Sequence, residues 1–341
     1  MRITVRGVVQ GVGFRPTVHR LARSMGLNGY VQNNGSNVVI EIDGDPQEFV
    51  ARLREALPPL ARLDSVEVSG GLPDAELREM GFAIVPSQAG TGGVGIPNDT
   101  AVCESCLREM FDPGDRRYLY PFTNCTDCGA RFTVIEDLPY DREKTSMRPF
   151  HMCPECSREY KDPDARRFHH QTVTCPVCGP RYHLLGPDGG RDYDDPIRKF
   201  ARALDKGMIG VAKSWGGMHL CCTLDRLEHM REWYRRKEKP FAIMVRDLEA
   251  LERYARPSRQ DIRLLTSSHR PIVLVDKVDG EVTELVAPGL GNIGVFLPYT
   301  AMQHLLFHHL DDDALVMTSA NVPGEPMVLR ETDALKLGAD V

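Results

Sequence analysis

The chain has 341 residues, of which 42% are hydrophobic and 26% charged, an ordinary composition for soluble globular domains. A net charge of −6 and an isoelectric point near 6.0 give no general reason to expect nucleic acid as a partner. No apolar run approaches the roughly 18–20 residues of a membrane span, and charges and glycines interrupt the N-terminal stretch where a signal peptide needs an apolar region. We therefore expect a cytoplasmic protein of two or three domains with no membrane partner.

Residues 1–90 contain no cysteine and predict a domain of alternating strands and helices. The hydrophobic pattern predicts strands at 2–9, 64–70 and 81–87, helices at 16–26 and 46–57, and a hairpin over 30–43 that turns at Asn34-Gly35. The first six of these elements along the chain follow the order β-α-β-β-α-β of the ferredoxin-like fold, in which two helices cover one face of an antiparallel sheet.

The loop QGVGFRP at 10–16 joins the first strand to the first helix. Its amides and the helix N-terminus converge where an anion would bind, and Arg15, expected in a solvent-facing loop, adds a planar charged fork for phosphate oxygens. Pro16 stands where a dinucleotide fingerprint has its third glycine, which excludes that motif. The loop is either a phosphate site or only a tight turn.

The middle of the chain, predicted as a domain over 97–184, is an internal repeat with an offset of 50 residues. Gly-rich stretches at 87–99 and 185–195 mark its two boundaries. Each half has the pattern C-x2-C-x18-C-x2-C, close to a common spacing of structural zinc sites. The predicted ligands are Cys103, Cys106, Cys125 and Cys128 in the first half and Cys153, Cys156, Cys175 and Cys178 in the second.

Two structural zinc ions are the expected cofactors of these cysteines, because four thiolates close a tetrahedral site and leave no open position for catalysis. Sequential pairing places one zinc in each repeat, and a nested pairing of the cysteine pairs also satisfies the symmetry. Nucleic-acid binding is the obvious rival role for a zinc module. Residues 103–183, however, hold 12 Lys and Arg against 13 Asp and Glu, which is a poor electrostatic match to a polyanion.

The third region, 192–341, returns to an αβ pattern. A helix is expected over 195–207 with Asp195 as its cap, followed by a strand-turn stretch over 208–220. Further strands are expected in RPIVLVDK, PGLGNIGVFLPYT and ALVMTSAN. A basic cluster over 235–239 follows a predicted helix, where cations complement the helix dipole.

The first region resembles acylphosphatase, through VQGVGFR followed by Asn33 in GYVQNN. The resemblance implies that residues Gln10, Gly11, Val12, Gly13, Phe14 and Arg15 bind phosphate. It also implies that Arg15 stabilises the transferred phosphoryl group and that Asn33 positions the attacking water. This chemistry is coherent, because an amide orients water and a guanidinium neutralises developing charge.

The third region resembles the YrdC-like domain, a twisted αβ fold with a nucleotide cavity, through KPFAIM, RPIVLV, PGLGNIGVFLPYT and TSAN at 318–321. The resemblance implies ATP binding by the lysine/arginine pair and the Ser-x-Asn motif, with Lys213 and His219 lining the opposite wall. Tyr234 stands where the family has the first lysine of the pair, and Lys237 is a possible substitute. The implied nucleotide-binding residues are Lys213, His219, Arg236, Lys237, Ser319 and Asn321.

The order of the three regions resembles the HypF-type carbamoyltransferases of [NiFe]-hydrogenase maturation. This resemblance implies hydrolysis of carbamoyl phosphate, then attack of carbamate on ATP with Mg to give carbamoyl-adenylate. A HypE-type maturation protein would receive the carbamoyl group on its C-terminal cysteine, towards the cyanide ligands of the hydrogenase. We expect the chain to be an N-terminal portion of such a protein, with its third domain incomplete at the C-terminus.

Three other functions compete with this interpretation. A threonylcarbamoyl-adenylate synthase would share the third region but needs neither the acylphosphatase-like nor the cysteine-rich segment. A zinc-stabilised nucleic-acid module and a non-catalytic scaffold are the remaining alternatives.

Overall fold

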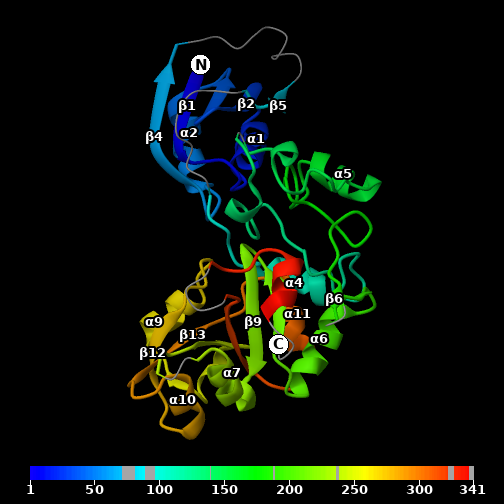
Figure 1. Ribbon diagram of the computed structural model, residues 1–341. Coiled ribbons are helices and arrows are strands. Elements are labelled where there is room, and N and C mark those ends of the chain that lie inside the picture. The colour runs from blue at the N-terminus through cyan, green and yellow to red at the C-terminus, as the bar shows by residue number, and fades with distance from the viewer. Residues whose placement is uncertain are drawn as a thin grey trace. The chain divides into compact units, whose positions relative to one another are not determined.

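The computed structural model describes residues 1–70, 81–88, 97–138, 140–186, 189–235, 238–321 and 326–337. The chain forms two compact units, each built from two segments (Figure 1). The first unit combines Met1–Asp99 with Thr123–Gly179, and the second combines Thr100–Phe122 with Pro180–Val341. Within the described residues, no helix has both the length and the apolar character that crossing a membrane requires.

The first unit contains a five-stranded sheet in the order β4-β1-β3-β2-β5. All neighbouring strands are antiparallel except β2 and β5, which run parallel. The order of strands and helices confirms the expected ferredoxin-like arrangement. The elements are β1 Arg2–Val8, α1 Phe14–Ser24, β2 Gly29–Asn34, β3 Asn37–Ile42, α2 Pro46–Glu55, β4 Arg62–Ser69 and β5 Phe82–Ile84.

Helices α1 and α2 pack on the same face of the sheet. Alternate strand residues point to one face, so a single buried cluster that joins the sheet to α1 and α2 fixes both helices there. Helix α1 contributes residues at the i, i+4 spacing of an amphipathic stripe, and α2 does the same. The cluster includes Ile3, Val5, Val38, Ile40, Val18, Ala22, Phe49 and Leu53.

The hairpin between β2 and β3 turns one residue later than the sequence predicted. Asn34 still pairs with Asn37, so the two-residue loop is Gly35-Ser36 rather than Asn34-Gly35. Gly35 has φ 56, a left-handed conformation that glycine adopts without a Cβ clash. Gly35 therefore still makes the turn, but as the first of the two loop residues rather than the second.

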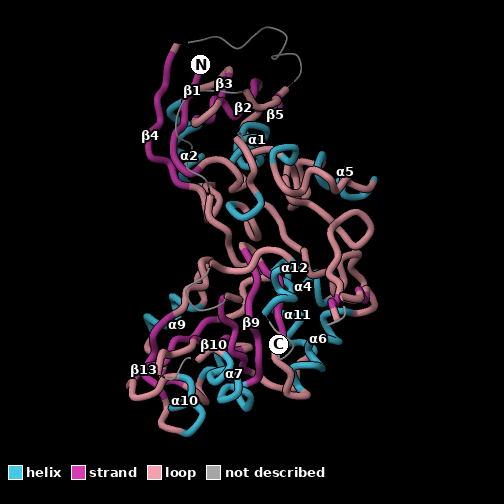
Figure 2. The backbone as a smooth tube through the Cα atoms, in the orientation of Figure 1, coloured by secondary structure: helices cyan, strands magenta, loops and turns pink. Residues whose placement is uncertain are grey.

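The cysteine-rich region is mostly loop, with one short helix in each repeat (Figure 2). Helix α4 spans Glu104–Phe111 and α5 spans Pro154–Lys161, and each begins directly after the first cysteine of its repeat. A helix N-terminus stabilises a thiolate at this position, which favours metal binding. Two short 3-10 turns, η1 Phe132–Val134 and η2 Arg142–Lys144, lie between the repeats.

The second unit contains a seven-stranded sheet in the order β11-β12-β13-β10-β14-β9-β8, with only β10 and β13 parallel among its paired strands. Two buried clusters lie on opposite faces, because neighbouring residues of β9 such as Cys221 and Cys222 belong to different ones. Helices α6 and α11 cover one face, and α7 to α10 cover the other. The result is a three-layer αβα domain.

After α4, which lies in its first segment, the second unit has short and long strands and helices in its second segment. They are β6 Leu184–Leu185, β7 Arg191–Asp192, α6 Pro196–Asp205, β8 Gly210–Ser214, β9 Gly217–Thr223, η3 Leu224–Arg226, α7 Leu227–Trp233, β10 Ala242–Val245, α8 Leu248–Leu251, β11 Ala255–Arg256, α9 Arg259–Leu265, β12 Val273–Lys277, α10 Glu281–Val286, β13 Asn292–Phe296, α11 Ala301–His309, β14 Ala314–Ser319, α12 Glu331–Ala334 and η4 Leu335–Leu337.

The cap expected for α6 has a different role. Asp195 precedes the helix but has φ 45, and its side chain makes no capping hydrogen bond. Its carboxylate instead contacts Arg198 Nε at 2.7 Å. Pro196 at the first helical position, which needs no amide partner, marks the helix start as predicted.

Gly7 sits where the β1–β4 ladder shifts register, and it offers a direct test of this sheet. Its φ is 137, and an added Cβ would lie 2.0 Å from the carbonyl oxygen of Arg62. We expect Gly7→Ala to lower the free energy of unfolding by about 2–3 kcal/mol in urea denaturation. Gly70→Ala is the control, because an added Cβ meets no atom of the described residues within 4 Å. Equal stability of the two variants would contradict the predicted clash.

Candidate functional site

The loop between β1 and α1 exposes backbone amides at the start of a helix. Gly11 and Gly13 have φ 71 and 76, and Gly13 occupies the N-cap position of α1 without a side-chain cap. The first amides of α1 are therefore available to an anion, where the helix dipole also favours negative charge. An added Cβ on Gly11 would lie 2.9 Å from the Pro97 side chain, so any residue larger than glycine would clash at this position.

Arg15 is buried, contrary to the expectation of a solvent-facing arginine. It is the second residue of α1, and only 8% of its surface is exposed. Asn33 on β2 is fully buried beside it. With its amide oxygen turned to the guanidinium, Asn33 accepts hydrogen bonds from Arg15 Nε at 3.3 Å and from Nη2 at 3.2 Å. The structure thus brings together the two residues that the resemblance marks as catalytic.

Two further groups hold the Arg15 side chain. Its Nη1 donates to Ser87 Oγ at 3.3 Å, and its Nη2 lies 3.3 Å from the Asp141 carboxylate. Asp141 lies outside the acylphosphatase-like region, between the two cysteine repeats. An ion pair that fixes the guanidinium also places a carboxylate close to the anion site, so a bound phosphate competes with Asp141 for Arg15.

The six residues expected to bind phosphate do not all face the same space. Gly11, Gly13, Phe14 and Arg15 line a pocket with about 330 Å³ of empty space, part of it open to solvent. Val12 is buried in the core of the sheet. Gln10 donates from Nε2 to the Gly35 carbonyl at 2.8 Å, which ties the loop to the β2–β3 hairpin. The side chains of Gln10 and Val12 therefore support the loop.

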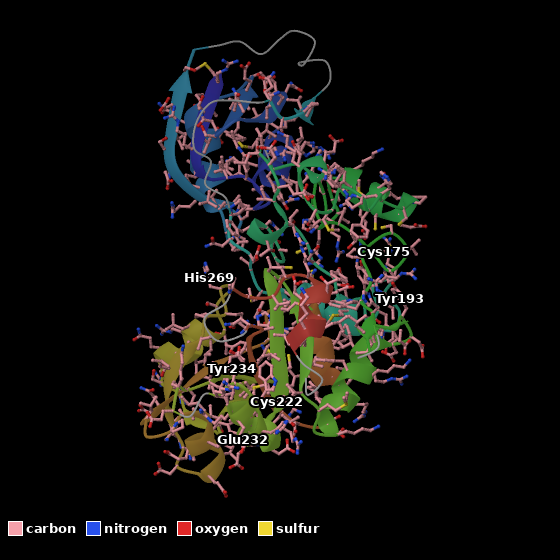
Figure 3. All side chains as sticks on the ribbon, in the orientation of Figure 1. Cys175, Tyr193, Cys222, Glu232, Tyr234 and His269 are labelled. Carbon is pink, nitrogen blue, oxygen red and sulfur yellow. The ribbon has the colours of Figure 1, made fainter. Side chains whose placement is uncertain are left out.

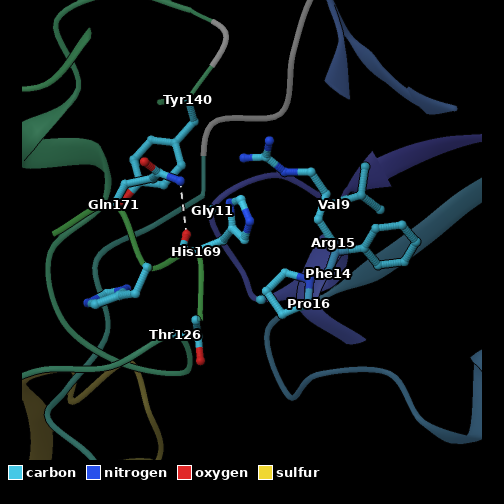
Figure 4. A pocket seen from close by; sticks show the side chains of 11 residues that line it. Val9, Gly11, Phe14, Arg15, Pro16, Thr126, Tyr140, His169 and Gln171 are labelled. Atoms are coloured by element: carbon cyan, nitrogen blue, oxygen red, sulfur yellow. Dashed lines mark hydrogen bonds between the residues drawn. The ribbon is translucent and has the colours of Figure 1, made fainter. Parts of the chain in front are cut away.

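The other wall of this pocket comes from the cysteine-rich segment of the same unit (Figure 4). Sequence reasoning missed these residues, because no motif connects them to the phosphate loop. The signal that was available is the repeat itself, in which His169, His170 and Gln171 of the second copy stand where the first has Leu119, Tyr120 and Pro121. The wall consists of Thr126, Tyr140, His169, His170 and Gln171.

Arg131 joins the phosphate loop to the cysteine-rich segment. Its side chain is almost fully buried, and its Nε donates to the Gly11 carbonyl. Its two terminal nitrogens donate to four carbonyls of the second cysteine pair's turn, those of Cys125, Thr126, Cys128 and Ala130. All five N–H donors of the guanidinium are thus used on backbone oxygens. The same side chain holds the cysteine turn and the phosphate loop.

The two sets of four cysteines have the geometry of metal sites. In each set the four sulfur atoms lie within 4.8 Å of one another, and the sets are sequential, which resolves the pairing that the sequence left open. Individual Sγ–Sγ distances are 3.8 Å for Cys125 and Cys128 and 3.6 Å for Cys156 and Cys178. A tetrahedron of sulfurs about 2.3 Å from zinc has edges of about 3.8 Å. The residues therefore fit two closed zinc sites.

In the second unit, Tyr234, which is labelled in Figure 3, makes hydrogen bonds to the Ser-x-Asn motif. Its hydroxyl donates to the Ser319 carbonyl at 2.7 Å and lies 3.2 Å from Asn321 Oδ1. Ser319 Oγ donates to the same Asn321 oxygen at 2.8 Å. Asn321 Oδ1 therefore accepts hydrogen bonds from two side chains of the protein. Tyr234, at the position where the resemblance implies a lysine, thus holds the Ser-x-Asn motif in place through the hydrogen bonds of its hydroxyl.

The remaining predicted nucleotide residues are not gathered on one wall. His219 pairs with Ala212 and with Ser319, whereas Lys213 pairs with Met218, so Lys213 and His219 point to opposite faces of the sheet. The register therefore does not place the two side chains on one wall, and their role in nucleotide binding stays a prediction. Lys213 Nζ instead lies 3.5 Å from the Leu329 carbonyl. Burial lowers the pKa of His219, which keeps it neutral at pH 7. Arg236 and Lys237 lie outside the described residues.

Three family models match the chain in succession. The model described as acylphosphatase matches residues 1–84, the HypF finger matches 102–135 and 152–185, and the model described as telomere recombination matches 202–340. The chain is also 44% identical over 72 residues to an acylphosphatase of Caldivirga maquilingensis, covering 20% of this chain and 76% of that protein.

Longer relatives match nearly the whole chain. Carbamoyltransferase HypF2 of Cupriavidus necator is 48% identical, and carbamoyltransferase HypF of Rhizobium leguminosarum is 47% identical, each over 98% of this chain. The chain spans 44% of the length of either protein. A crystal structure of full-length HypF in its phosphate- and nucleotide-bound form is 42% identical, with a TM-score of 0.91 over 98% of this chain and 44% of that one. The chain belongs to the HypF carbamoyltransferase family.

Proposed function

We propose that the first unit hydrolyses carbamoyl phosphate to carbamate and phosphate. The observation that carries this proposal is the contact of buried Arg15 with buried Asn33 beside the bare amides of the Gly11–Gly13 loop. The related HypF whose crystal structure contains phosphate supports an anion at such a site. A loop that served only as a turn would not require a buried arginine aimed at a pocket.

In this proposal each group has a separate task. The amides at the start of α1 and the Arg15 guanidinium hold the phosphoryl oxygens and neutralise the charge that develops during transfer. Asn33 orients the attacking water through its amide, and its contact with Arg15 fixes the distance between water and phosphorus. The leaving group is carbamate, which departs as the P–O bond breaks.

We further propose that the second unit binds ATP, as its magnesium complex, and forms carbamoyl-adenylate. The carbamate oxygen attacks the α-phosphorus and pyrophosphate leaves. Ser319 and Asn321 would contact the nucleotide, held in place by Tyr234, with His219 on the same face of the sheet as Ser319. Arg236 and Lys237 would supply positive charge to the phosphates. Lys213, on the other face, belongs to this set only through the resemblance.

The domain boundaries, the partner and the cellular location also remain proposals. We place the acylphosphatase-like domain at 1–90, the tandem zinc domain at 97–184 and the YrdC-like domain at 192–341. We propose that the protein is cytoplasmic and that a HypE-type maturation protein receives the carbamoyl group for hydrogenase cyanide ligands. Two zinc ions would act as scaffold, because four thiolates leave no site for substrate.

We expect about two zinc ions per chain, one in each four-cysteine set, because each set fits a closed tetrahedral site. Native mass spectrometry of the purified protein measures this number directly. Cys156→Ser should reduce the content to about one ion, whereas Cys222→Ser, a buried cysteine outside both sets, should leave it unchanged. A folded, metal-free protein would contradict the assignment.

Arg15→Ala should slow carbamoyl phosphate hydrolysis by at least about a hundredfold, since removing one charge-stabilising group typically costs about 3 kcal/mol of transition-state stabilisation. Arg20→Ala changes an exposed arginine of the same helix and should retain activity. Phosphate release from each purified variant is the measurement. If Arg15→Ala hydrolyses carbamoyl phosphate at the wild-type rate, the loop is only a structural turn and not a phosphate site.

Asn321→Ala should abolish pyrophosphate release that depends on carbamoyl phosphate and ATP, while carbamoyl phosphate hydrolysis continues. The reason is that the two chemical steps use residues of different units. Asn292→Ala, at an exposed position that starts β13, is the control and should retain both activities. Pyrophosphate release by Asn321→Ala at the wild-type rate would exclude this asparagine from the nucleotide site.

A further inference from the structure

The wall of the pocket opposite the phosphate loop contains polar groups that the proposed hydrolysis does not use. The imidazole of His169 is directed toward the loop that carries Arg15 (Figure 4). Its ring makes no hydrogen bond to any other residue that the structure describes. The Tyr140 hydroxyl is buried in the same wall and is likewise without a partner among the described residues. A buried polar group without a partner costs free energy, which is recovered when a ligand supplies the hydrogen bond.

The neighbours of these two groups are already satisfied. Gln171 donates to the His169 carbonyl at 2.9 Å and accepts from the Arg142 amide at 2.9 Å. His170 Nε2 lies 2.6 Å from Asn124 Oδ1 and 2.9 Å from Thr172 Oγ1. Gln171 and His170 thus hold the wall in shape. His169 and Tyr140 are left to contact a ligand.

The two cysteine repeats provide an internal comparison for His169. At the offset of 50 residues, Leu119 is its counterpart in the first repeat. Both residues have φ 51, and both donate their amide to the equivalent helix, Leu119 to Met110 at 2.8 Å and His169 to Tyr160 at 2.9 Å. The unusual backbone is therefore a property of the repeat. What distinguishes the second repeat is the side chain.

The difference between the repeats extends along the whole pocket-facing stretch. Residues Leu119, Tyr120 and Pro121 of the first repeat are replaced by His169, His170 and Gln171 in the second. Only the second stretch lines the phosphate pocket. The shared backbone does not require the change from Leu119 to His169, because both side chains are carried by the same left-handed conformation. The imidazole at this position therefore points to a role in the pocket that only the second stretch lines.

We propose that this wall recognises the acyl end of the substrate, with the His169 imidazole and the Tyr140 hydroxyl hydrogen-bonding the carbamoyl group. The inference deepens the proposed function and rests on it. The phosphate loop and Arg15 hold the phosphoryl end, so the acyl end faces the opposite wall. A carbamoyl group presents N–H donors and a carbonyl acceptor, and the two side chains supply both an acceptor and donors.

The charge state of His169 agrees with this role. Burial, reinforced by the nearby Arg15 charge, lowers the pKa of His169 to about 4. The ring is therefore neutral at pH 7, with one nitrogen that donates and one that accepts. Burial also raises the pKa of Tyr140, which keeps its hydroxyl protonated and able to donate. A neutral pair suits an uncharged carbamoyl group, while the charge of Arg15 is reserved for the phosphoryl group.

The test compares carbamoyl phosphate with acetyl phosphate, which carries a methyl group in place of the amino group. We expect wild type to prefer carbamoyl phosphate in kcat/KM. His169→Leu, which installs the side chain found at Leu119, and Tyr140→Phe should each reduce that preference by about tenfold or more. Inhibition by inorganic phosphate should change less than about twofold, because the phosphate loop is untouched. His169→Asn keeps a hydrogen-bonding group that tolerates the left-handed backbone and should lose less.

Leu119→His is the matched control, since it makes the reverse change on the same backbone outside the pocket. It should leave the preference unchanged. The inference is wrong if His169→Leu and Tyr140→Phe both keep the wild-type preference for carbamoyl phosphate. It is also wrong if each variant loses kcat/KM equally for both substrates, because the wall then does not recognise the acyl group. If wild type hydrolyses neither substrate, the proposed function itself fails and the inference fails with it.

Discussion

The buried guanidinium of Arg131 is the interaction on which the phosphate site depends. The Arg131 side chain is almost fully buried. Its five N–H groups donate hydrogen bonds to carbonyls of the Cys125–Cys128 turn and its neighbour Ala130, and to the carbonyl of Gly11. Among the described residues its guanidinium pairs with no carboxylate, and a buried cation of this kind is costly unless nearby negative charge compensates it. Zinc held by four thiolates would carry net negative charge, so the metal that orders the turn would also stabilise the arginine.

This arrangement makes the cysteine-rich segment part of the phosphate site. Arg131 holds the loop, Asp141 holds Arg15, and residues 169–171 form the opposite wall. Within one compact unit, the cysteine-rich segment lines the side of the pocket that faces the phosphate loop of the acylphosphatase-like fold. The two copies of the repeat therefore differ in use, because residues 169–171 of the second copy line the pocket and the equivalent residues 119–121 of the first copy do not.

Several features were predictable from the sequence because they follow from local rules. Hydrophobic periodicity identified the strands and helices of the first unit, and the cysteine spacing identified both metal sets. Arg15 and Asn33 were identified by resemblance, and the structure brings them into contact. The burial of Arg15 was not predictable, since its cover comes from residues more than a hundred positions away. The faces that Lys213 and His219 occupy were not predictable either, because strand register decides the face of a side chain and a shift of one residue reverses it.

The central claim is that the metal-bound cysteine turn holds the phosphate loop through Arg131. Amide hydrogen exchange of residues 9–16 before and after removal of zinc by a chelator tests it most directly. The account predicts that protection of this loop falls when zinc is removed, while β1 and β3 in the core of the same sheet keep their protection. Unchanged protection of residues 9–16 in the metal-free protein would contradict the claim.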